Sequence, residues 1–188
     1  REILALKGGH ATGIASGAFS PDGREIITAD FHGKMIVWDA RTGLARLARS
    51  ADKGPLFCAA FSPDGKRIIT ASEKKIAVIW DAQSGDRLIT LKGHRDRVTS
   101  ASFRRDGTQV VTTGADGAAM IWDAPSGRMR RALRGHQGYV RAAAFSPDGR
   151  LIATAGDDRT AMIWDAQSGR KLTTLNGHGN EVLSVAFS

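Results

Sequence analysis

The sequence repeats itself at a fixed interval of 42 residues. All four tryptophans of the chain follow this interval, and each of them precedes an aspartate: Trp38, Trp80, Trp122 and Trp164. A period of about 20 to 50 residues is typical of repeat architectures, in which a unit is stable only when it stacks on its neighbours. Because 41% of the residues are hydrophobic, the repeats have enough apolar side chains for a packed core.

Composition narrows the setting in which such repeats work. The one cysteine, Cys58, excludes an internal disulfide framework and is typical of a reducing compartment, so we expect a cytoplasmic (intracellular) protein. No apolar run approaches the roughly 18 to 20 residues of a membrane span, and no signal peptide opens the chain. Because residues 1–6 match the middle of a repeat, we expect the chain to be a fragment of a longer protein.

Each unit contains four short runs that predict strands. In the last complete unit these runs are 140–145, 151–155, 162–165 and 171–175. The tetrapeptide Ser-Pro-Asp-Gly at 146–149 predicts a tight turn, because Pro presets φ and Gly accepts the left-handed position that returns the chain. Small residues in the first run of every unit indicate that the units crowd together there, as around a central axis. The pattern predicts an all-β blade of four antiparallel strands, buried on both faces.

Three motifs recur in register with the period: Gly-His, Ser-Pro-Asp-Gly and Trp-Asp. Together they resemble the WD-repeat β-propeller family, whose repeat is about 40 to 45 residues long. The resemblance implies an all-β fold, a β-propeller of four-stranded antiparallel blades in an incomplete ring. It places an outer strand of a preceding blade at 1–10 and the start of a fifth blade at 177–188. Four complete blades lie between them: 11–49, 50–93, 94–135 and 136–176.

The family's structural signature is a hydrogen-bonded tetrad of Trp, Ser or Thr, His and Asp within one blade. By motif position, the resemblance assigns this tetrad to the third and fourth blades: His94, Thr112, Asp116, Trp122, and His136, Thr154, Asp158, Trp164. Such a tetrad is physically reasonable, because a buried indole N–H needs an acceptor and the other three groups can pass hydrogen bonds on to a surface turn.

The first two blades depart from the tetrad pattern. The first blade keeps three members but has histidine at the aspartate position: His10, Thr28, Trp38 and His32. The second keeps only the hydroxyl and the indole, and has other residues at the histidine and aspartate positions: Thr70, Trp80, Asp52 and Lys74. Because these partners are missing, we expect the first two blades to be less rigid than the other two.

No pattern in the sequence predicts a catalytic, cofactor or metal site, so we expect a protein that is not an enzyme. Four of the five histidines belong to the repeated Gly-His, and the tetrad accounts for them. The Trp-Asp aspartates recur in identical settings, whereas catalytic carboxylates need different environments to separate their pKa values. No Cys/His cluster has zinc spacing, no Gly-rich loop precedes a helix, and no Gly-x-Ser-x-Gly occurs.

The resemblance also implies where partners bind. Members of the family often contact other proteins or peptides through the narrow face of the propeller, at fixed positions after the Gly-His and just before the tetrad aspartate. Carried over to this sequence, the candidate partner-binding residues are Phe31, Phe57, Glu73, Arg97, Thr99, Tyr139, Arg141 and Asp157. They vary from repeat to repeat, and Tyr and Arg are favoured at interface hot spots. The competing interpretation is that they are ordinary variable loop residues.

We therefore predict a protein–protein interaction scaffold, a non-catalytic platform within a larger signalling or regulatory protein. Two alternatives remain open. The net charge of +8 and the run Arg128, Arg130, Arg131 and Arg134 suit nucleic acid or an anionic surface, although charge on a solvated edge strand is the simpler interpretation. The repeats are alternatively a regulatory appendage of a catalytic domain outside this stretch. A ring of the usual seven blades needs roughly 290 residues at this period, so closure requires further repeats or a second copy.

Overall fold

The computed structural model describes residues 5–6, 9–51 and 54–188, and these residues form sixteen strands and no helix. The first blade contains β1 (Ile14–Phe19), β2 (Glu25–Asp30), β3 (Lys34–Asp39) and β4 (Ala45–Ser50). The second contains β5 (Leu56–Phe61), β6 (Arg67–Ser72), β7 (Ile76–Asp81) and β8 (Arg87–Lys92). The third contains β9 (Val98–Phe103), β10 (Gln109–Gly114), β11 (Ala118–Asp123) and β12 (Met129–Arg134). The fourth contains β13 (Val140–Phe145), β14 (Leu151–Gly156), β15 (Ala161–Asp165) and β16 (Lys171–Leu175).

The four strands of each blade pair in chain order, and all pairs are antiparallel. The tryptophan of the third strand lies opposite an apolar residue of the second, as Trp122 lies opposite Val110. The register to the outer strand shifts at the same tryptophan in every blade. The predicted all-β blades of four antiparallel strands are confirmed.

The described residues contain no helix that could cross a membrane.

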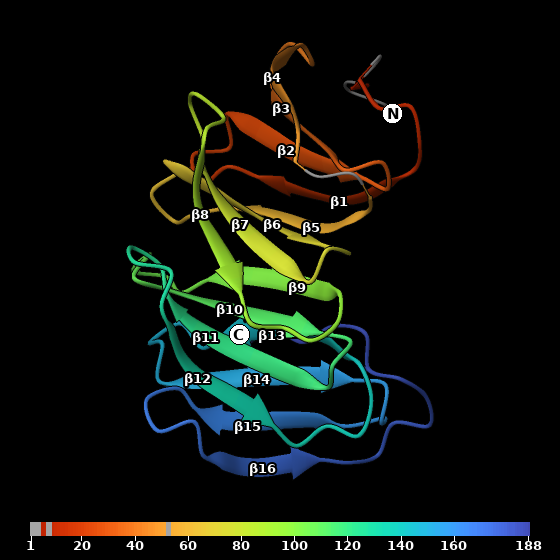
Figure 1. The fold of residues 1–188 in the computed structure, drawn as a ribbon, viewed down its shortest axis with the longest axis vertical. Coiled ribbons are helices and arrows are strands. Elements are labelled where there is room, and N and C mark those ends of the chain that lie inside the picture. The colour runs from red at the N-terminus through yellow and green to blue at the C-terminus, as the bar shows by residue number, and fades with distance from the viewer. Residues whose placement is uncertain (1–4, 7–8, 52–53) are drawn as a thin grey trace.

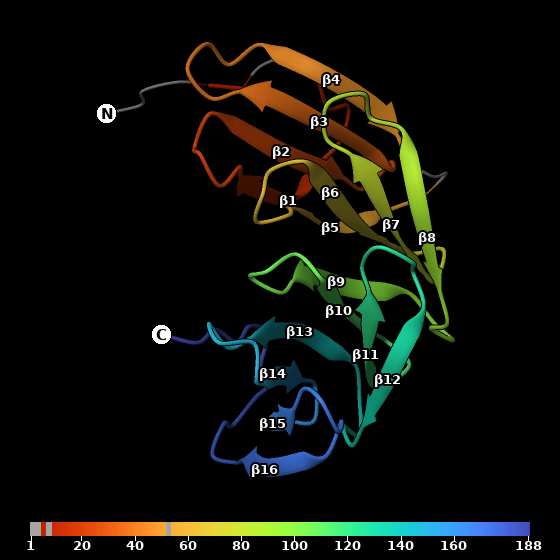
Figure 2. The same cartoon turned by 90° about the vertical axis from the view of Figure 1, so that its left-hand side faces the viewer.

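The blades follow one another along an open arc (Figures 1 and 2). The first strands β1, β5, β9 and β13 lie toward the concave side of this arc, and the fourth strands lie on its outside (Figure 2). Each first strand contacts the first strand of the next blade, which forms a continuous inner wall. Because the first and fourth blades lie at opposite ends of the arc, the four blades form an incomplete ring (Figure 2).

Buried apolar side chains form one core at each junction between neighbouring blades. At the first junction, Ile27 and Val37 of the first blade pack with Ile68 and other residues of the second. Exposure follows from this stacking: Phe61 is 9% exposed at the first junction, whereas Phe19 at the same repeat position is 66% exposed. The difference arises because no described blade covers that face of the first blade.

Small side chains on the first strands let neighbouring blades approach at the inner wall. Ser16 Oγ accepts a hydrogen bond from the backbone N–H of Ala59 at 3.1 Å, and Ser102 Oγ donates to the carbonyl of Ala143 at 3.2 Å. Cys58 makes a similar contact, because its Sγ lies 3.4 Å from the carbonyl oxygen of Ala101. Larger side chains would hold the backbones too far apart for these bonds, which explains the small residues of this strand.

The two ends of the chain carry no strand in the residues described. Residues 176–188 are irregular, although the sequence predicts the first strand of a fifth blade there. A strand needs a hydrogen-bonded neighbour, and this segment makes one backbone bond to the fourth blade, from Val182 N to the Gly156 carbonyl at 3.0 Å. The outer strand predicted at 1–10 falls partly on residues outside the described ranges. The fifth blade and the preceding blade stay predictions.

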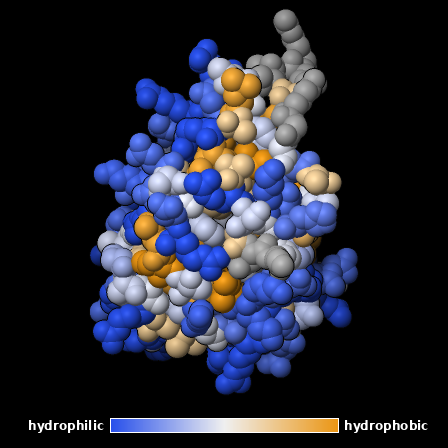
Figure 3. All heavy atoms as spheres, turned by 45° about the horizontal axis from the view of Figure 1, so that its top comes forward, coloured by the Kyte–Doolittle hydropathy of each residue, from blue (hydrophilic) through white to orange (hydrophobic). Residues whose placement is uncertain are grey.

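The connections between strands make two faces. We use "top face" for the turns between second and third strands together with the connections from one blade to the next. The "bottom face" holds the turns between first and second strands and between third and fourth strands. Figure 3 shows polar side chains over most of the surface seen from that direction, with apolar side chains in separate patches.

Candidate functional site

The tetrads of the third and fourth blades are complete in the structure. In the third blade, Trp122 Nε1 donates to Thr112 Oγ1 at 2.7 Å, and Thr112 Oγ1 lies 2.8 Å from His94 Nε2. His94 Nδ1 lies 3.0 Å from the nearer carboxylate oxygen of Asp116. The Asp116 carboxylate can only accept, so the ring donates to it from Nδ1. Burial favours the neutral ring by lowering the pKa of His94, and Nε2 of that neutral ring accepts from the Thr112 hydroxyl.

The fourth blade repeats this geometry with nearly the same distances. Trp164 Nε1 lies 2.9 Å from Thr154 Oγ1, which lies 2.8 Å from His136 Nε2. His136 Nδ1 lies 2.9 Å from Asp158 Oδ1. The Asp158 carboxylate also accepts from the backbone N–H of Gln137 at 3.0 Å, which ties the tetrad to the connection that enters the blade. The tetrad thus fixes the top-face connection to the blade interior.

The electrostatics of the tetrads agree with this proton arrangement. Burial lowers the pKa of His94, and it outweighs the neighbouring Asp116, which alone would raise it. Burial would raise the pKa of Asp158, but hydrogen bonds from Gln137 N–H, His136 and Thr160 hold that pKa at about 2. Both groups keep the charge state that the network needs near neutral pH: a neutral ring and an ionised carboxylate.

The first blade also has a complete tetrad, which corrects the expectation from its sequence. His10 Nδ1 lies 2.7 Å from Asp30 Oδ2, His10 Nε2 lies 2.6 Å from Thr28 Oγ1, and Trp38 Nε1 donates to Thr28 Oγ1 at 2.7 Å. The carboxylate comes from Asp30, two residues before the motif position, and His32 is exposed. The premise that the first blade lacks a tetrad partner is therefore wrong.

The third and fourth blades show why Asp30 can take this place. They have glycine at the equivalent position, and a Cβ added to Gly114 would lie 2.5 Å from His94 Nδ1 and 2.6 Å from Asp116 Oδ1. A side chain at this position therefore points directly at the histidine. In the first blade that side chain is itself a carboxylate, so no second one is needed. A lone aspartate at the glycine position was the sequence signal for this arrangement.

The second blade has only part of the network. Trp80 Nε1 donates to Thr70 Oγ1 at 2.9 Å, and no described histidine or carboxylate extends the chain of hydrogen bonds from Thr70. Asp52, at the histidine position, lies outside the described residues, and Lys74, at the aspartate position, is exposed. The indole N–H is nevertheless satisfied, so the second blade keeps the essential buried hydrogen bond.

Five of the candidate partner-binding residues come together on the top face of the second to fourth blades. The guanidinium carbon of Arg97 lies 5.8 Å from the ring centroid of Phe57 and 5.2 Å from that of Tyr139. The guanidinium carbon of Arg141 lies 5.3 Å from the Tyr139 centroid. Arg141 also makes a bidentate ion pair with Asp157, in which Nε donates to Oδ1 at 2.5 Å and Nη2 donates to Oδ2 at 2.7 Å. We call these five residues the top-face cluster.

The top-face cluster surrounds a small depression. Four of the residues that line it are Phe57, Arg97, Thr99 and Arg141, around a volume of about 240 Å3. Leu183 from the irregular C-terminal segment lines it as well. It lies 42 residues after Arg141, at the repeat position of Phe57 and Thr99, so the repeat predicts its place beside them although its segment forms no strand.

Three other candidate residues lie outside the cluster. Thr99 turns inward, where its hydroxyl lies 2.8 Å from that of Thr113, and it bonds the Val140 carbonyl of the next blade. Phe31 is 45% exposed and lies beside Gly13 of its own blade. Glu73 is exposed on the turn after β6, and none of the described hydrogen bonds or ion pairs involves its carboxylate.

The basic run of β12 does not present four equivalent charges. Arg130 forms an ion pair with Asp123, and the Arg131 Nη1 donates to the carbonyl of Arg130 at 2.7 Å. Arg128 and Arg134 are exposed, and none of the described carboxylates pairs with them. Among the described residues, no group of three or more His, Cys, Asp or Glu side chains lies close enough to hold a metal ion.

The repeat, the blades and the tetrads agree with a comparison against protein-family models. The model described as "WD domain, G-beta repeat" matches residues 2–39, 46–81, 85–123 and 127–165. These four segments cover most of the chain and coincide with the four tryptophan-bearing units. A comparison with curated protein sequences gave no match. The chain belongs to the WD-repeat family.

Proposed function

We propose that this chain is a non-catalytic platform that binds a peptide segment of another protein through the top-face cluster. WD-repeat domains generally mediate protein–protein interactions, which gives the general class of function. One observation supports the specific site. Side chains of different types from successive blades form a continuous stack on the top face, where the tetrads fix the backbone connections. The blade frameworks repeat, whereas the members of this stack do not, as expected for residues that serve recognition.

The top-face cluster is ordered before any partner arrives. Asp157 grips Arg141 through two parallel hydrogen bonds, and Tyr139 lies between the two guanidinium groups. Each cation–π contact of this kind contributes about 0.5 to 2 kcal/mol. Because the side chains are already fixed, binding loses little of their rotational freedom, which favours affinity.

The chemistry of the cluster favours an acidic peptide. The Arg97 guanidinium lies between two aromatic rings, and no described carboxylate forms an ion pair with it. The charge of Arg141, by contrast, is balanced by Asp157. Tyr139 is 36% exposed, so its ring offers an apolar surface beside the free charge of Arg97. A partner carboxylate at Arg97 and an apolar side chain on Tyr139 would match these two groups.

Selection from a random peptide library displayed on phage tests this proposal. Peptides enriched on the wild-type chain are synthesised, and their affinity is measured for Tyr139→Ala, Arg97→Ala and, as the control, Phe31→Ala. We expect enriched peptides to contain Asp or Glu and to bind the first two variants at least tenfold more weakly, as at a hot spot. Phe31 is an exposed aromatic residue outside the cluster, so its replacement should leave the affinity unchanged.

Two results would overturn the proposal. The first is a library that yields no enriched peptide on a folded chain. The second is a set of peptides whose affinity falls equally in all three variants, or in none of them, because the cluster would then not be the binding surface. A circular dichroism spectrum of each variant shows whether the fold is retained.

A further inference from the structure

The bottom face differs from one blade junction to the next. At the first junction, Arg46 of β4 crosses to the second blade and donates to the carbonyl oxygens of Ala82 and Gln83, at 2.7 and 3.1 Å. Glu25 of its own blade pairs with the same guanidinium and holds it in place. This junction is therefore bridged by an arginine that a carboxylate orients.

The second junction is bridged in another way. Arg67 of β6 stands at the repeat position of Glu25 and donates to the carbonyl of Gly107 in the third blade at 2.8 Å. Its guanidinium carbon also lies 5.3 Å from the ring centroid of Phe103. A guanidinium thus spans the bottom of the first junction and another that of the second, and each donates to backbone carbonyl oxygens of the following blade.

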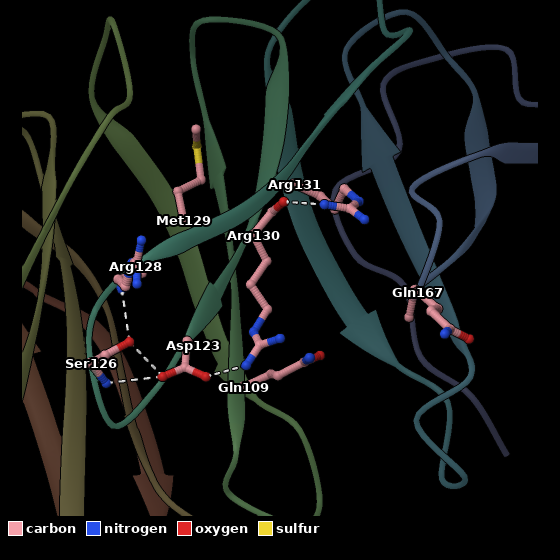
Figure 4. A pocket seen from close by; sticks show the side chains of 9 residues that line it. Gln109, Asp123, Ser126, Arg128, Met129, Arg130, Arg131 and Gln167 are labelled. Atoms are coloured by element: carbon pink, nitrogen blue, oxygen red, sulfur yellow. Dashed lines mark hydrogen bonds and ion pairs between the residues drawn. The ribbon is translucent and has the colours of Figure 1, made fainter.

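At the bottom of the third junction Arg104 packs against Gly149, but none of the described arginines donates a hydrogen bond across to the fourth blade. Arg130 stands at the repeat position of Arg46, but it turns back to Asp123 of its own blade (Figure 4). The cause is the residue at the position of Glu25, which is Gln109, because a neutral amide cannot hold a guanidinium as a carboxylate does. Within the described residues, neither Arg130 nor Arg131 donates a hydrogen bond to the fourth blade.

A second replacement changes the chemistry of this junction. Leu47 and Ile89 lie against Gly85 and Gly127 of the following blade, and the aliphatic part of Arg131 takes the same place against Gly169, beside Leu133. A depression of about 730 Å3 lies between the third and fourth blades, lined mainly by β12, the turn before it and the turn that contains Gln167. The first junction has a depression of about 490 Å3 at the equivalent place, but there the carboxylates of Glu25 and Asp81 balance Arg46 and Lys66.

The lining of this pocket is rich in hydrogen-bond donors and carries net positive charge. It contains three arginines, two glutamine amides and one serine hydroxyl (Figure 4): Arg128, Arg130, Arg131, Gln109, Gln167 and Ser126. Its one carboxylate, Asp123, is bound by Ser126 and Arg130, which lower its pKa to about 2. A neighbouring depression of about 310 Å3 shares Gln109 and Gln167 and adds Arg104.

We propose that this pocket binds a small phosphate-bearing anion, with Arg131, on the side of Gln167, as the principal charged ligand (Figure 4). Guanidinium groups suit phosphate oxygens because they present several N–H donors in a fixed plane. The two glutamine amides can complete the donor set on either side of the junction. The site lies on the opposite face from the top-face cluster, so it is independent of the proposed peptide binding.

Calorimetric titration of the 188-residue chain with inorganic pyrophosphate tests the proposal, with two matched variants. Arg131→Leu introduces the residue that the first junction has at this position, and Arg134→Ser introduces the residue found at the equivalent Ser50. Each removes one positive charge from β12, but Arg134 does not line the pocket. We expect Arg131→Leu to weaken binding about tenfold and Arg134→Ser to change it by less than about twofold.

A third variant tests the contribution of the uncharged Gln109 to the net charge of the lining. Gln109→Glu restores the carboxylate of the first junction, so we expect it to repel pyrophosphate and to weaken binding at least as strongly as Arg131→Leu. The proposal is overturned if the folded wild-type chain does not bind pyrophosphate. It is also overturned if Arg131→Leu and Arg134→Ser weaken pyrophosphate binding equally. A third contrary result is a single-stranded oligonucleotide whose affinity falls equally in these two variants, because the arginines of β12 would then bind the nucleic-acid backbone along the whole strand.

Discussion

Asp157 and Asp158 are neighbours in the sequence but belong to two different regions of the molecule. Asp158 accepts from His136 and completes a tetrad that the third blade repeats with Asp116. Asp157 binds Arg141 in the top-face cluster, and its repeat positions in the other blades hold Phe31, Glu73 and Ala115. A step of one residue thus separates a position that serves the framework from one that is free to vary.

These two aspartates show how a protein built of similar repeats can present a surface that is specific for one partner. The tetrad fixes the backbone of the turn, so the adjacent residue is presented in the same place in each blade whatever its identity. Charged hydrogen bonds in the buried tetrad contribute substantially to stability, whereas a half-exposed ion pair contributes about 0 to 1 kcal/mol. Substitutions at the two kinds of position should therefore separate loss of stability from loss of binding.

The largest effect is expected from the tetrad hydroxyl. Thr112→Val removes the acceptor of Trp122 and the donor to His94, so two buried groups lose their partner and stability should fall by about 3 kcal/mol. Thr70→Val in the second blade leaves only the indole N–H of Trp80 without its partner, so about half that loss of stability is expected. Urea unfolding followed by tryptophan fluorescence measures both. Equal losses would show that the histidine arm of the tetrad contributes nothing.

The corrected tetrad of the first blade provides the next test. Asp30→Ala removes the acceptor of His10 and of two backbone N–H groups, so it should destabilise the chain by about 2 kcal/mol. His32→Ala, at the motif position, should change stability by less than about 0.5 kcal/mol, because the side chain is exposed. The same unfolding experiment applies. A larger effect at His32 than at Asp30 would restore the assignment by motif position.

The two adjacent aspartates give the most direct contrast in stability. Asp158→Asn weakens a charged hydrogen-bond network and should cost about 1.5 to 2 kcal/mol at neutral pH. Asp157→Asn weakens a surface pair, and a cost below about 0.5 kcal/mol is expected. Thermal unfolding of the two variants side by side measures the difference.

Acid should test the carboxylate of the fourth-blade tetrad. The folded pKa of Asp158 is about 2, below the unfolded value of about 3.9. Its stabilising contribution is therefore complete above about pH 4 and is lost as the pH falls toward 2. Relative to wild type, Asp158→Asn should lose less stability over this range, which unfolding experiments at several pH values measure. Parallel slopes for the two proteins would contradict the assignment.

The smallest effect concerns the open junction on the bottom face. Arg131→Leu places an apolar side chain against Gly169, as Leu47 lies against Gly85, and should stabilise the chain by about 0.5 kcal/mol. Chemical unfolding with Arg134→Ser as the reference detects a difference of this size. Destabilisation by Arg131→Leu would mean that the arginine makes contacts at the junction that a leucine cannot replace.

The fold could be predicted because its signals are local and repeated. Ser-Pro-Asp-Gly and Trp-Asp fix where strands end, and the predicted runs 140–145 and 171–175 coincide with β13 and β16. The tetrad carboxylate of the first blade was missed because a motif counts sequence positions, whereas a hydrogen bond requires only that Asp30 reach His10. The stacking of Arg97 on Tyr139 and the turning back of Arg130 both depend on residues of different strands or blades, which no local pattern contains.

The central claim is that the top-face cluster recognises a partner while the tetrads carry stability. The most direct measurement is the affinity of a library-selected acidic peptide for wild type and for Tyr139→Ala, together with the melting temperature of both. We predict at least tenfold weaker binding with a melting temperature lowered by only about 2 to 4 °C, since Tyr139 loses two cation–π contacts. Unchanged affinity in a folded Tyr139→Ala variant would contradict the claim.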